Sequence, residues 1–419
     1  MKSKDQFIDS LRHKCEELIG RQVKKNNDVI ELESILNKNI NKTISLSSLR
    51  RFFGLIPSTK PNDKTLNIIA KGLGYSSFTG FCKSTNNNDD WSFLNKLIQF
   101  ENKDRLNRSE IFFLEENSYQ QSKLLAYFLR RLIENGNNSI LDQIFSHPNI
   151  FRLADSDKGE LAQIMGESTR KLKIKQINIL GDLLIRNELL RNFLLYMYVD
   201  YDGFFNNYFY LLKYVNENGN LTYQETLFYQ LIYRSRKLLT NKKVDILDDL
   251  IEPIHPILLG RYIGHKIIVN LDFSLNEIKI KKSDAQSFAH ELIPLLIINR
   301  DFNTLELIVK DYYEELISPG YNTFEDKQAI ALIALAINNI NKQKYKEAVL
   351  NLSFLNVEEI LPSHRNFLTI LSSIPKHFIA VHSKTEHKIK VIETRYLSLA
   401  KALKFSLFSL DYLKNYFKM

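Results

Sequence analysis

Residues 44–82, ISLSSLRRFFGLIPSTKPNDKTLNIIAKGLGYSSFTGFC, carry the clearest local pattern in the chain. A short helix is predicted over residues 46–53, because apolar residues recur at helical spacing and would share one buried face: Leu46, Leu49 and Phe53. Ser45 precedes the helix and is typical of an N-cap. Gly54 is expected to end it, because glycine readily takes the left-handed conformation found after a helix C-terminus.

Four more helices are predicted around this one. The first spans residues 5–20, with an inward stripe made of Phe7, Ile8, Leu11, Cys15, Leu18 and Ile19. The second begins at a capping box of Asp28 and Glu31 and is expected to turn Ile30, Ile35 and Leu36 inward. The third is capped by Asp63 and closed by Gly74, and the fourth starts at Ser76.

Five short helices in about 80 residues resemble the lambda-repressor-like helix-turn-helix domains of the Xre type. In that family a recognition helix is followed by a proline-containing loop and by a helix that ends in Leu-Gly. Here these parts read ISLSSLRRFFG and KPNDKTLNIIAKGLGYSS. The resemblance implies binding of double-stranded DNA, and it covers residues 28–83 best.

The helix predicted over residues 46–53 places Ser47, Ser48 and Arg51 on its outer face and Arg50 on the flank. Arginine and serine on such a helix can contact base edges in the major groove, while flanking cations contact phosphates. The predicted DNA-contacting set therefore comprises Ser45, Ser47, Ser48, Arg50, Arg51, Lys42, Lys60 and Lys64.

The family pattern is incomplete in this chain. The turn NINKT at residues 39–43 contains no glycine, and the stretch NDVIELES lacks the Thr/Ser-Gln pair that often begins the family's second helix. An alternative interpretation follows from these departures: the chain is a protein-interaction scaffold whose helix-turn-helix-like domain does not bind DNA.

Charge is distributed unevenly along the chain. Residues 1–85 hold 15 Lys and Arg against 8 Asp and Glu, whereas the remaining 334 residues are nearly neutral, with 42 against 40. A basic module joined to a neutral body is the arrangement expected of a protein that docks on phosphates.

Residues 91–419 are predicted to form a helical solenoid, joined through a linker at residues 85–90 and with a possible subdivision near residues 253–273. Within that subdivision, residues 265–273 are expected to be extended. Residues 329–362 resemble one tetratricopeptide unit, with its spacing carried by Leu335, Ala336, Tyr345, Ala348, Leu352, Leu355 and Pro362. The fold class predicted is all-α, and the solenoid is expected to bind a peptide or protein or to pair two protomers in a homodimer.

The tract 193–214, FLLYMYVDYDGFFNNYFYLLKY, is rich in aromatic residues. Stacking on unpaired bases would need exposed rings beside cations. The tract holds one lysine and two aspartates, so packing between helices is the preferred interpretation.

No arrangement typical of an enzyme or metal site is found. The spacing of five between His377, His382 and His387 does not place them on one helical face, so no metal, cofactor or catalytic residue is predicted. Cys15 and Cys82 are expected to be core residues. No membrane span and no secretory signal are recognised, so the cytoplasm is the location expected. Together with the resemblance to helix-turn-helix domains, this predicts a cytoplasmic DNA-binding regulator.

Overall fold

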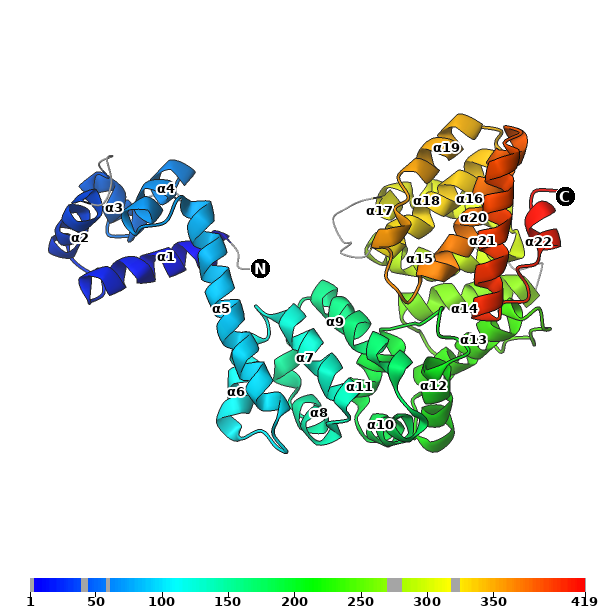
Figure 1. The fold of residues 1–419 in the computed structure, drawn as a ribbon, viewed down its shortest axis with the longest axis horizontal. Coiled ribbons are helices and arrows are strands. Elements are labelled where there is room, and N and C mark those ends of the chain that lie inside the picture. The colour runs from blue at the N-terminus through cyan, green and yellow to red at the C-terminus, as the bar shows by residue number, and fades with distance from the viewer. Residues whose placement is uncertain (1–3, 39–43, 58–60, 270–280, 318–324, 419) are drawn as a thin grey trace. The chain divides into compact units, whose positions relative to one another are not determined.

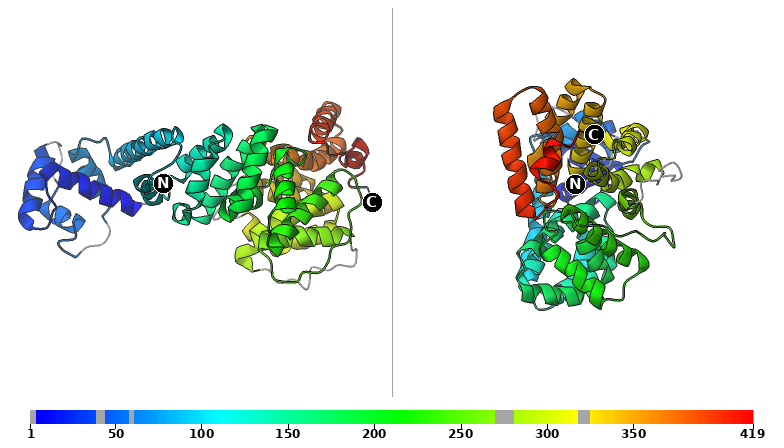
Figure 2. Two further views of the ribbon diagram at one scale, coloured as in Figure 1. Left: turned by 90° about the horizontal axis from the view of Figure 1, so that it is seen from below. Right: turned by 90° about the vertical axis from the view of Figure 1, so that its right-hand side faces the viewer.

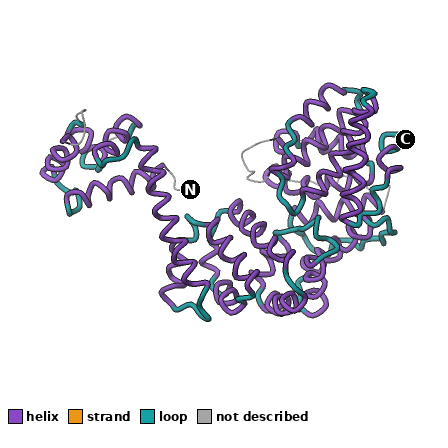
Figure 3. The backbone as a smooth tube through the Cα atoms, in the orientation of Figure 1, coloured by secondary structure: helices purple, strands orange, loops and turns teal. Residues whose placement is uncertain are grey.

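The computed structural model describes residues 4–38, 44–57, 61–269, 281–317 and 325–418, which are helical almost throughout (Figure 1). Across these ranges the chain forms helices and connecting loops and no strand, as the backbone tube shows (Figure 3). The all-α class predicted from the sequence is therefore confirmed for this part of the chain. None of these helices is both long and apolar enough to cross a membrane.

The chain divides into two compact units. Unit 1 comprises residues 1–102 and 112–124, and unit 2 comprises residues 103–111 and 125–419. The helices of unit 1 are α1 (Lys4–Ile19), α2 (Asn26–Lys38), α3 (Leu46–Phe52), α4 (Asp63–Gly72) and α5 (Phe78–Glu101), and α6 (Arg108–Asn117) contributes to both units.

The core of unit 1 is formed by apolar side chains from one face of each of helices α1 to α5. Its fully buried members include Leu11, Cys15, Leu32, Leu36, Leu49, Phe52, Leu66, Ile69 and Phe81. Cys15 behaves as a small apolar residue here, because burial raises the pKa of its thiol to about 12.

Two apolar residues predicted to face inward are exposed instead, Leu18 and Ile30. On α2 the buried face is formed by Val29, Leu32 and Leu36, and the helix begins at Asn26 and not at Asp28. Asp28 lies in the first turn, where its carboxylate accepts hydrogen bonds from the backbone N–H groups of Lys24 (3.1 Å) and Lys25 (2.9 Å). The capping box predicted for Asp28 and Glu31 is therefore wrong.

The linker predicted at residues 85–90 is also wrong, because helix α5 runs unbroken from Phe78 to Glu101. Ser77, and not Ser76, caps this helix: its hydroxyl accepts a hydrogen bond from the Gly80 N–H at 3.0 Å. Polar residues cost a helix only about 0.5 kcal/mol each, so the sequence STNNNDD does not end one that packs at both ends. Unit 1 continues to Asn102.

Unit 2 consists of successive helices, most of which pack against helices close to them in the sequence; they are coloured from cyan-green to red (Figures 1 and 2). Its elements are α7 (Ser122–Asn135), α8 (Asn138–Phe145), η1 (Pro148–Phe151), α9 (Asp155–Ser168), η2 (Thr169–Lys171), α10 (Ile174–Arg186), α11 (Glu188–Arg191), η3 (Asn192–Tyr196), α12 (Asn207–Asn218), α13 (Tyr223–Leu239), α14 (Pro256–Val269), α15 (Lys282–Asn299), α16 (Phe302–Asp311), α17 (Tyr313–Ile317), α18 (Glu325–Asn341), α19 (Tyr345–Ser353), η6 (Val357–Glu359), α20 (Arg365–His382), α21 (Glu386–Leu403) and α22 (Leu410–Lys414).

The segment that resembles a tetratricopeptide unit forms a helical hairpin of α18 and α19. Ala336, Ile340 and Ala348 form its small core, with Tyr345 and Leu352 packed against them. Asn339 donates a hydrogen bond across the hairpin to Asn351 at 2.9 Å. The structure thus contains the predicted hairpin, while its membership of the tetratricopeptide class remains a prediction.

Residues 265–269 are helical and not extended as predicted, because α14 runs from Pro256 to Val269. Proline is favoured in the first turn of a helix, where its missing N–H would have no partner. Residues 270–273 lie outside the described residues. Pro256 therefore marks the start of a helix within the predicted subdivision.

Candidate nucleic-acid interface

Helix α3 is held in unit 1 by hydrogen bonds at its start and by apolar packing beneath it. The side-chain amide of Asn37 on α2 accepts a hydrogen bond from the Ile44 N–H at 2.9 Å and donates to the Ile44 carbonyl at 3.4 Å. Leu49 and Phe52 are then fully buried in the core. Gly54 follows with a φ of +71°, the left-handed conformation predicted for it.

The outer face of α3 carries the side chains predicted for base contact. Ser45, Ser47 and Arg51 are exposed, Ser48 and Arg50 are half-buried, and Lys64 is exposed on α4. Lys42 and Lys60 lie outside the described residues. The structure therefore exposes one hydroxyl and one guanidinium on this helix, those of Ser47 and Arg51, and one predicted lysine on α4.

Two of the predicted hydroxyls are used within the helix. Ser45 Oγ accepts a hydrogen bond from the Ser48 N–H at 3.2 Å and lies 2.9 Å from Ser48 Oγ. Ser45 is thus the N-cap that the sequence predicts, and capping of this kind contributes about 1 kcal/mol to a helix. Ser47 and Arg51 are the members of the predicted set that are exposed on α3 itself.

Arg50 lies between the buried and exposed faces. Its Nε atom is buried without a hydrogen-bond partner among the residues that the structure describes. An unsatisfied donor of this kind is costly, but a phosphate oxygen cannot reach a buried Nε atom from outside the protein. The phosphate contact predicted for Arg50 therefore gains no support from this atom and stays a prediction.

Other cations of unit 1 are engaged within the unit. Arg12 donates to the Phe52 carbonyl at 2.8 Å and to Asp9 at 2.7 Å. Lys4 pairs with Asp63 at 2.6 Å, which ties the start of α1 to the start of α4. The positive charge counted in the sequence is therefore only partly available to a partner.

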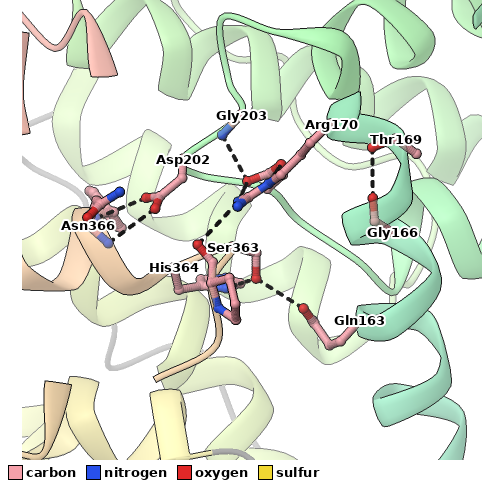
Figure 4. Close-up of polar contacts among 12 residues, drawn as sticks. Gln163, Gly166, Thr169, Arg170, Asp202, Gly203, Ser363, His364 and Asn366 are labelled. Carbon is pink, nitrogen blue, oxygen red and sulfur yellow. Dashed lines mark hydrogen bonds and ion pairs between the residues drawn. The ribbon is translucent and has the colours of Figure 1, made fainter. Parts of the chain in front are cut away.

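A second candidate site lies in unit 2, where a pocket of about 380 Å³ is lined by Arg170, Asp202, Asn206, Pro362, Arg365, Asn366 and Leu403. Arg170 forms a two-point ion pair with Asp200, with Nε 2.7 Å from Oδ2, and also donates to the Pro362 carbonyl at 3.2 Å (Figure 4). Ser363 donates to Gln163 at 3.1 Å. The pocket wall thus joins residues about 200 positions apart in the sequence.

Asp202 connects this wall to the start of α20. Its carboxylate accepts hydrogen bonds from the backbone N–H groups of Asn366 (3.2 Å) and Phe367 (3.1 Å), and its own N–H donates to the Ser363 carbonyl at 3.1 Å. Burial raises the pKa of Asp202 to about 7, even though these N–H groups and Arg170 act in the opposite direction. The arginines of the pocket are already paired with protein groups, so we assign it no ligand.

A buried ion pair lies deeper in unit 2. Arg261 of α14 contacts Glu291 of α15 and donates to the Tyr201 hydroxyl at 3.0 Å. Both charged side chains are almost fully buried. Burial alone would raise the pKa of Glu291, but the charge of Arg261 lowers it to about 2.

Sequence reasoning missed Arg170, Asp202, Arg261 and Glu291. The spacing YVDYDG at residues 198–203 was the one visible signal, because two aspartates in an aromatic tract need partners if they are buried. Their partners lie 30 or more residues away, where helical periodicity gives no information.

Comparisons with known proteins give no match to a family model, to a curated protein or to a solved structure.

Proposed function

We propose that this protein is a DNA-binding transcriptional regulator in which α3 enters the major groove of a duplex. The observation that carries the proposal is the outward position of Ser47 and Arg51 on a short helix whose opposite side, Leu49 and Phe52, is fully buried. A rigid helix that presents arginine and serine to the outside can donate to base edges.

In this proposal Arg51 contacts guanine, Ser47 contacts a base or phosphate, and Arg50 and Lys64 contact phosphates. Unit 2 would act in the cytoplasm as the part that binds a peptide or protein or that pairs two protomers. Its binding state would then change the affinity of the regulator for its operator.

A scaffold that does not bind DNA is the second candidate. It is favoured by the mutual hydrogen bonding of Ser45 and Ser48, which removes two of the predicted hydroxyl contacts. Such a protein would present α3 to another protein instead of to a groove.

The test is selection of duplexes from a random pool by the purified full-length protein, followed by titration of the selected duplex at several salt concentrations. A regulator should lose affinity steeply as salt rises, because phosphate contacts release counterions. Arg51→Ala should weaken binding by about 1–3 kcal/mol and relax one base position.

Arg395→Ala is the matched control, because Arg395 is exposed on α21 and loses the same charge. If both substitutions change duplex affinity equally, α3 is not the helix that contacts the bases. If no duplex is selected at all, the scaffold is the better description.

A further inference from the structure

Tyrosine rings gather on two neighbouring helices of unit 2, α12 and α13, and helix α10 lies beside α12. Tyr210 and Tyr214 stack on α12 with ring centroids 6.5 Å apart. Tyr229 and Tyr233 stack on α13 at 6.3 Å, and both also stack on Phe209, at 6.1 and 6.2 Å. Interplanar angles of 16° to 25° make all of these pairs nearly parallel.

The aromatic tract of residues 193–214 therefore separates into two parts. Tyr198, Phe204 and Tyr208 are fully buried and pack between helices, as the sequence predicts. By contrast, Tyr210 is 46% exposed, and Tyr233, which lies beyond the tract on α13, is 41% exposed. Large rings at this exposure, grouped on one surface, are typical of an interaction site.

The rings on α12 are fixed in place by α10. The Tyr210 hydroxyl donates to Asn178 at 3.2 Å, and the Tyr214 hydroxyl donates to Asp182 at 2.7 Å. Gly181 makes room for the second ring, because a Cβ at this position would lie 2.6 Å from Tyr214 Cδ1. Rings held in this way lose little conformational freedom when a partner stacks on them.

Cations lie beside the rings. The Arg236 guanidinium lies 4.4 Å from the Phe205 ring centroid and 4.2 Å from that of Phe209, and it forms no ion pair with any residue the structure describes. Lys213 lies on α12 between Phe209 and Tyr214 and pairs with Glu217 at 3.5 Å. Lys237 lies over Tyr233 at 5.1 Å and pairs with Asp245.

Further lysines lie at one end of these helices. The Tyr210–Asn178 and Tyr214–Asp182 contacts run in the same direction along α10 and α12, so the start of α10 lies beside the start of α12. The contact of Arg236 with Phe205 brings the end of α13 to that same end. The exposed lysines there are Lys171, Lys173, Lys175, Lys242 and Lys243.

The aspartates of the tract do not oppose this charge. Asp200 is fully buried against Arg170, and Asp202 accepts hydrogen bonds from the start of α20. In the sequence alone, these two acids and the single lysine of the tract disfavour base stacking. The structure turns both acids inward and supplies cations from α10 and α13.

We infer that this surface, the tyrosine face formed by Tyr210, Tyr214, Tyr229, Tyr233 and Arg236, binds single-stranded nucleic acid. Unpaired bases stack on exposed tyrosines, and the lysines at the end of the helices contact phosphates. Bases of a duplex already stack on one another, so the tyrosine face should discriminate against double strands. The inference is independent of the duplex contact proposed for α3.

The test uses the full-length protein and fluorescein-labelled oligonucleotides of one mixed sequence as single-stranded DNA, single-stranded RNA and DNA duplex, with anisotropy as the readout. The double substitution Tyr229→Ala/Tyr233→Ala should weaken single-strand binding by roughly tenfold or more, because each stacked base contributes measurably to affinity. Tyr229→Phe/Tyr233→Phe should retain binding, since the rings remain. Comparison of the DNA and RNA arms shows which strand is preferred.

Tyr127→Ala is the matched control, because Tyr127 is 46% exposed on α7 and lies outside the tyrosine face. It should leave binding unchanged, and circular dichroism should show equal helix content in all variants. Lys242→Gln/Lys243→Gln should reduce the dependence of single-strand affinity on salt.

The inference is overturned if the unaltered protein binds neither single strand at low salt, or if Tyr127→Ala and the double alanine variant lose affinity equally. It is also overturned if an acidic polypeptide, poly-glutamate, binds the tyrosine face and single-stranded oligonucleotides do not displace it. Arg51→Ala should leave single-strand affinity intact, and the tyrosine variants should leave duplex affinity intact, so failure of either proposal is seen separately.

Discussion

Neighbouring residues of α3 have opposite surroundings. Leu49 is fully buried in the core of unit 1, whereas Arg51, two residues later, is exposed. A rotation of 100° per residue along the helix separates the two directions. Because both are fixed by the same helix, a substitution at each position tests a different property: stability at Leu49 and binding at Arg51.

Leu49→Asp should unfold unit 1, because it places a carboxylate in a small apolar core with no cation to pair with it. Hydrogen exchange measured by mass spectrometry should show lost protection in α1–α4, with protection in α14 and α15 retained. Ser47→Asp is the matched control: it introduces the same charge on the exposed face and should leave protection unchanged. Retained protection of α3 in Leu49→Asp would show that the buried stripe is misassigned.

At the scale of single residues, the sequence predicts burial well where it is local and periodic. Leu49, Leu66 and Phe81 are buried as their spacing indicates. Leu18 and Ile30 are exposed. Each lies at an edge of its helix's apolar stripe, and the position of the neighbouring helix decides which edge of the stripe is buried. The exposed state of Tyr233 and the buried state of Asp200 also depend on distant packing and could not be predicted.

At the scale of elements, helix ends are predicted where a side chain caps the backbone next to it. Ser45 and Gly54 delimit α3 for this reason. The predicted linker is wrong because the composition of a segment does not show what the helix around it packs against. Phe93, Leu97 and Phe100 are buried near the C-terminal end of α5, and this packing stabilises the helix although its middle is polar. Contacts between helices far apart in sequence, such as that between Asp202 and α20, leave no periodic signal.

A buried ion pair, Arg261–Glu291, lies within the contact of α14 with α15. Glu291→Ala should destabilise unit 2 by about 3–5 kcal/mol, because it leaves the charge of Arg261 buried with no carboxylate beside it. Chemical denaturation followed by circular dichroism measures the change.

Glu217→Ala removes a carboxylate from an exposed pair with Lys213 and serves as the control. It should change stability by about 0.5 kcal/mol or less, since surface pairs contribute little. Similar losses in the two variants would mean that the buried Arg261–Glu291 pair matters no more to stability than a surface pair.

At the scale of the whole molecule, the two units have separate proposed roles. Unit 1 exposes a serine and an arginine on α3, for which we propose contact with a duplex, and unit 2 exposes the tyrosine face. The excess charge of the first 85 residues pointed to unit 1 alone, because the cations of unit 2 are balanced in number by acids. Their positions matter more than their number: Asp200 and Glu291 are turned inward, while Lys173 and Lys242 are exposed.

Asp202 joins the loop before α12 to the start of α20, and this contact should respond to pH. The native protein keeps the Asp202 proton up to about pH 7, whereas an unfolded chain releases it near pH 4. Between these values the native state binds more protons, so the contribution of Asp202 to the free energy of unfolding falls as pH rises. One proton gives a slope of at most about 1.4 kcal/mol per pH unit.

Asp202→Asn should remove this slope, which urea denaturation of the variant and the unaltered protein at each pH from 4 to 8 would measure. The difference between the two is the informative quantity, because burial lowers the pKa of His265 to about 3 and gives a slope of opposite sign in the same window. Arg170, Asp200 and Arg365 lie around Asp202 and are present in both proteins. Asp245→Asn, at an exposed carboxylate, should leave the slope unchanged. A difference that does not vary with pH would show that Asp202 is ionised throughout and contributes only its hydrogen bonds to α20.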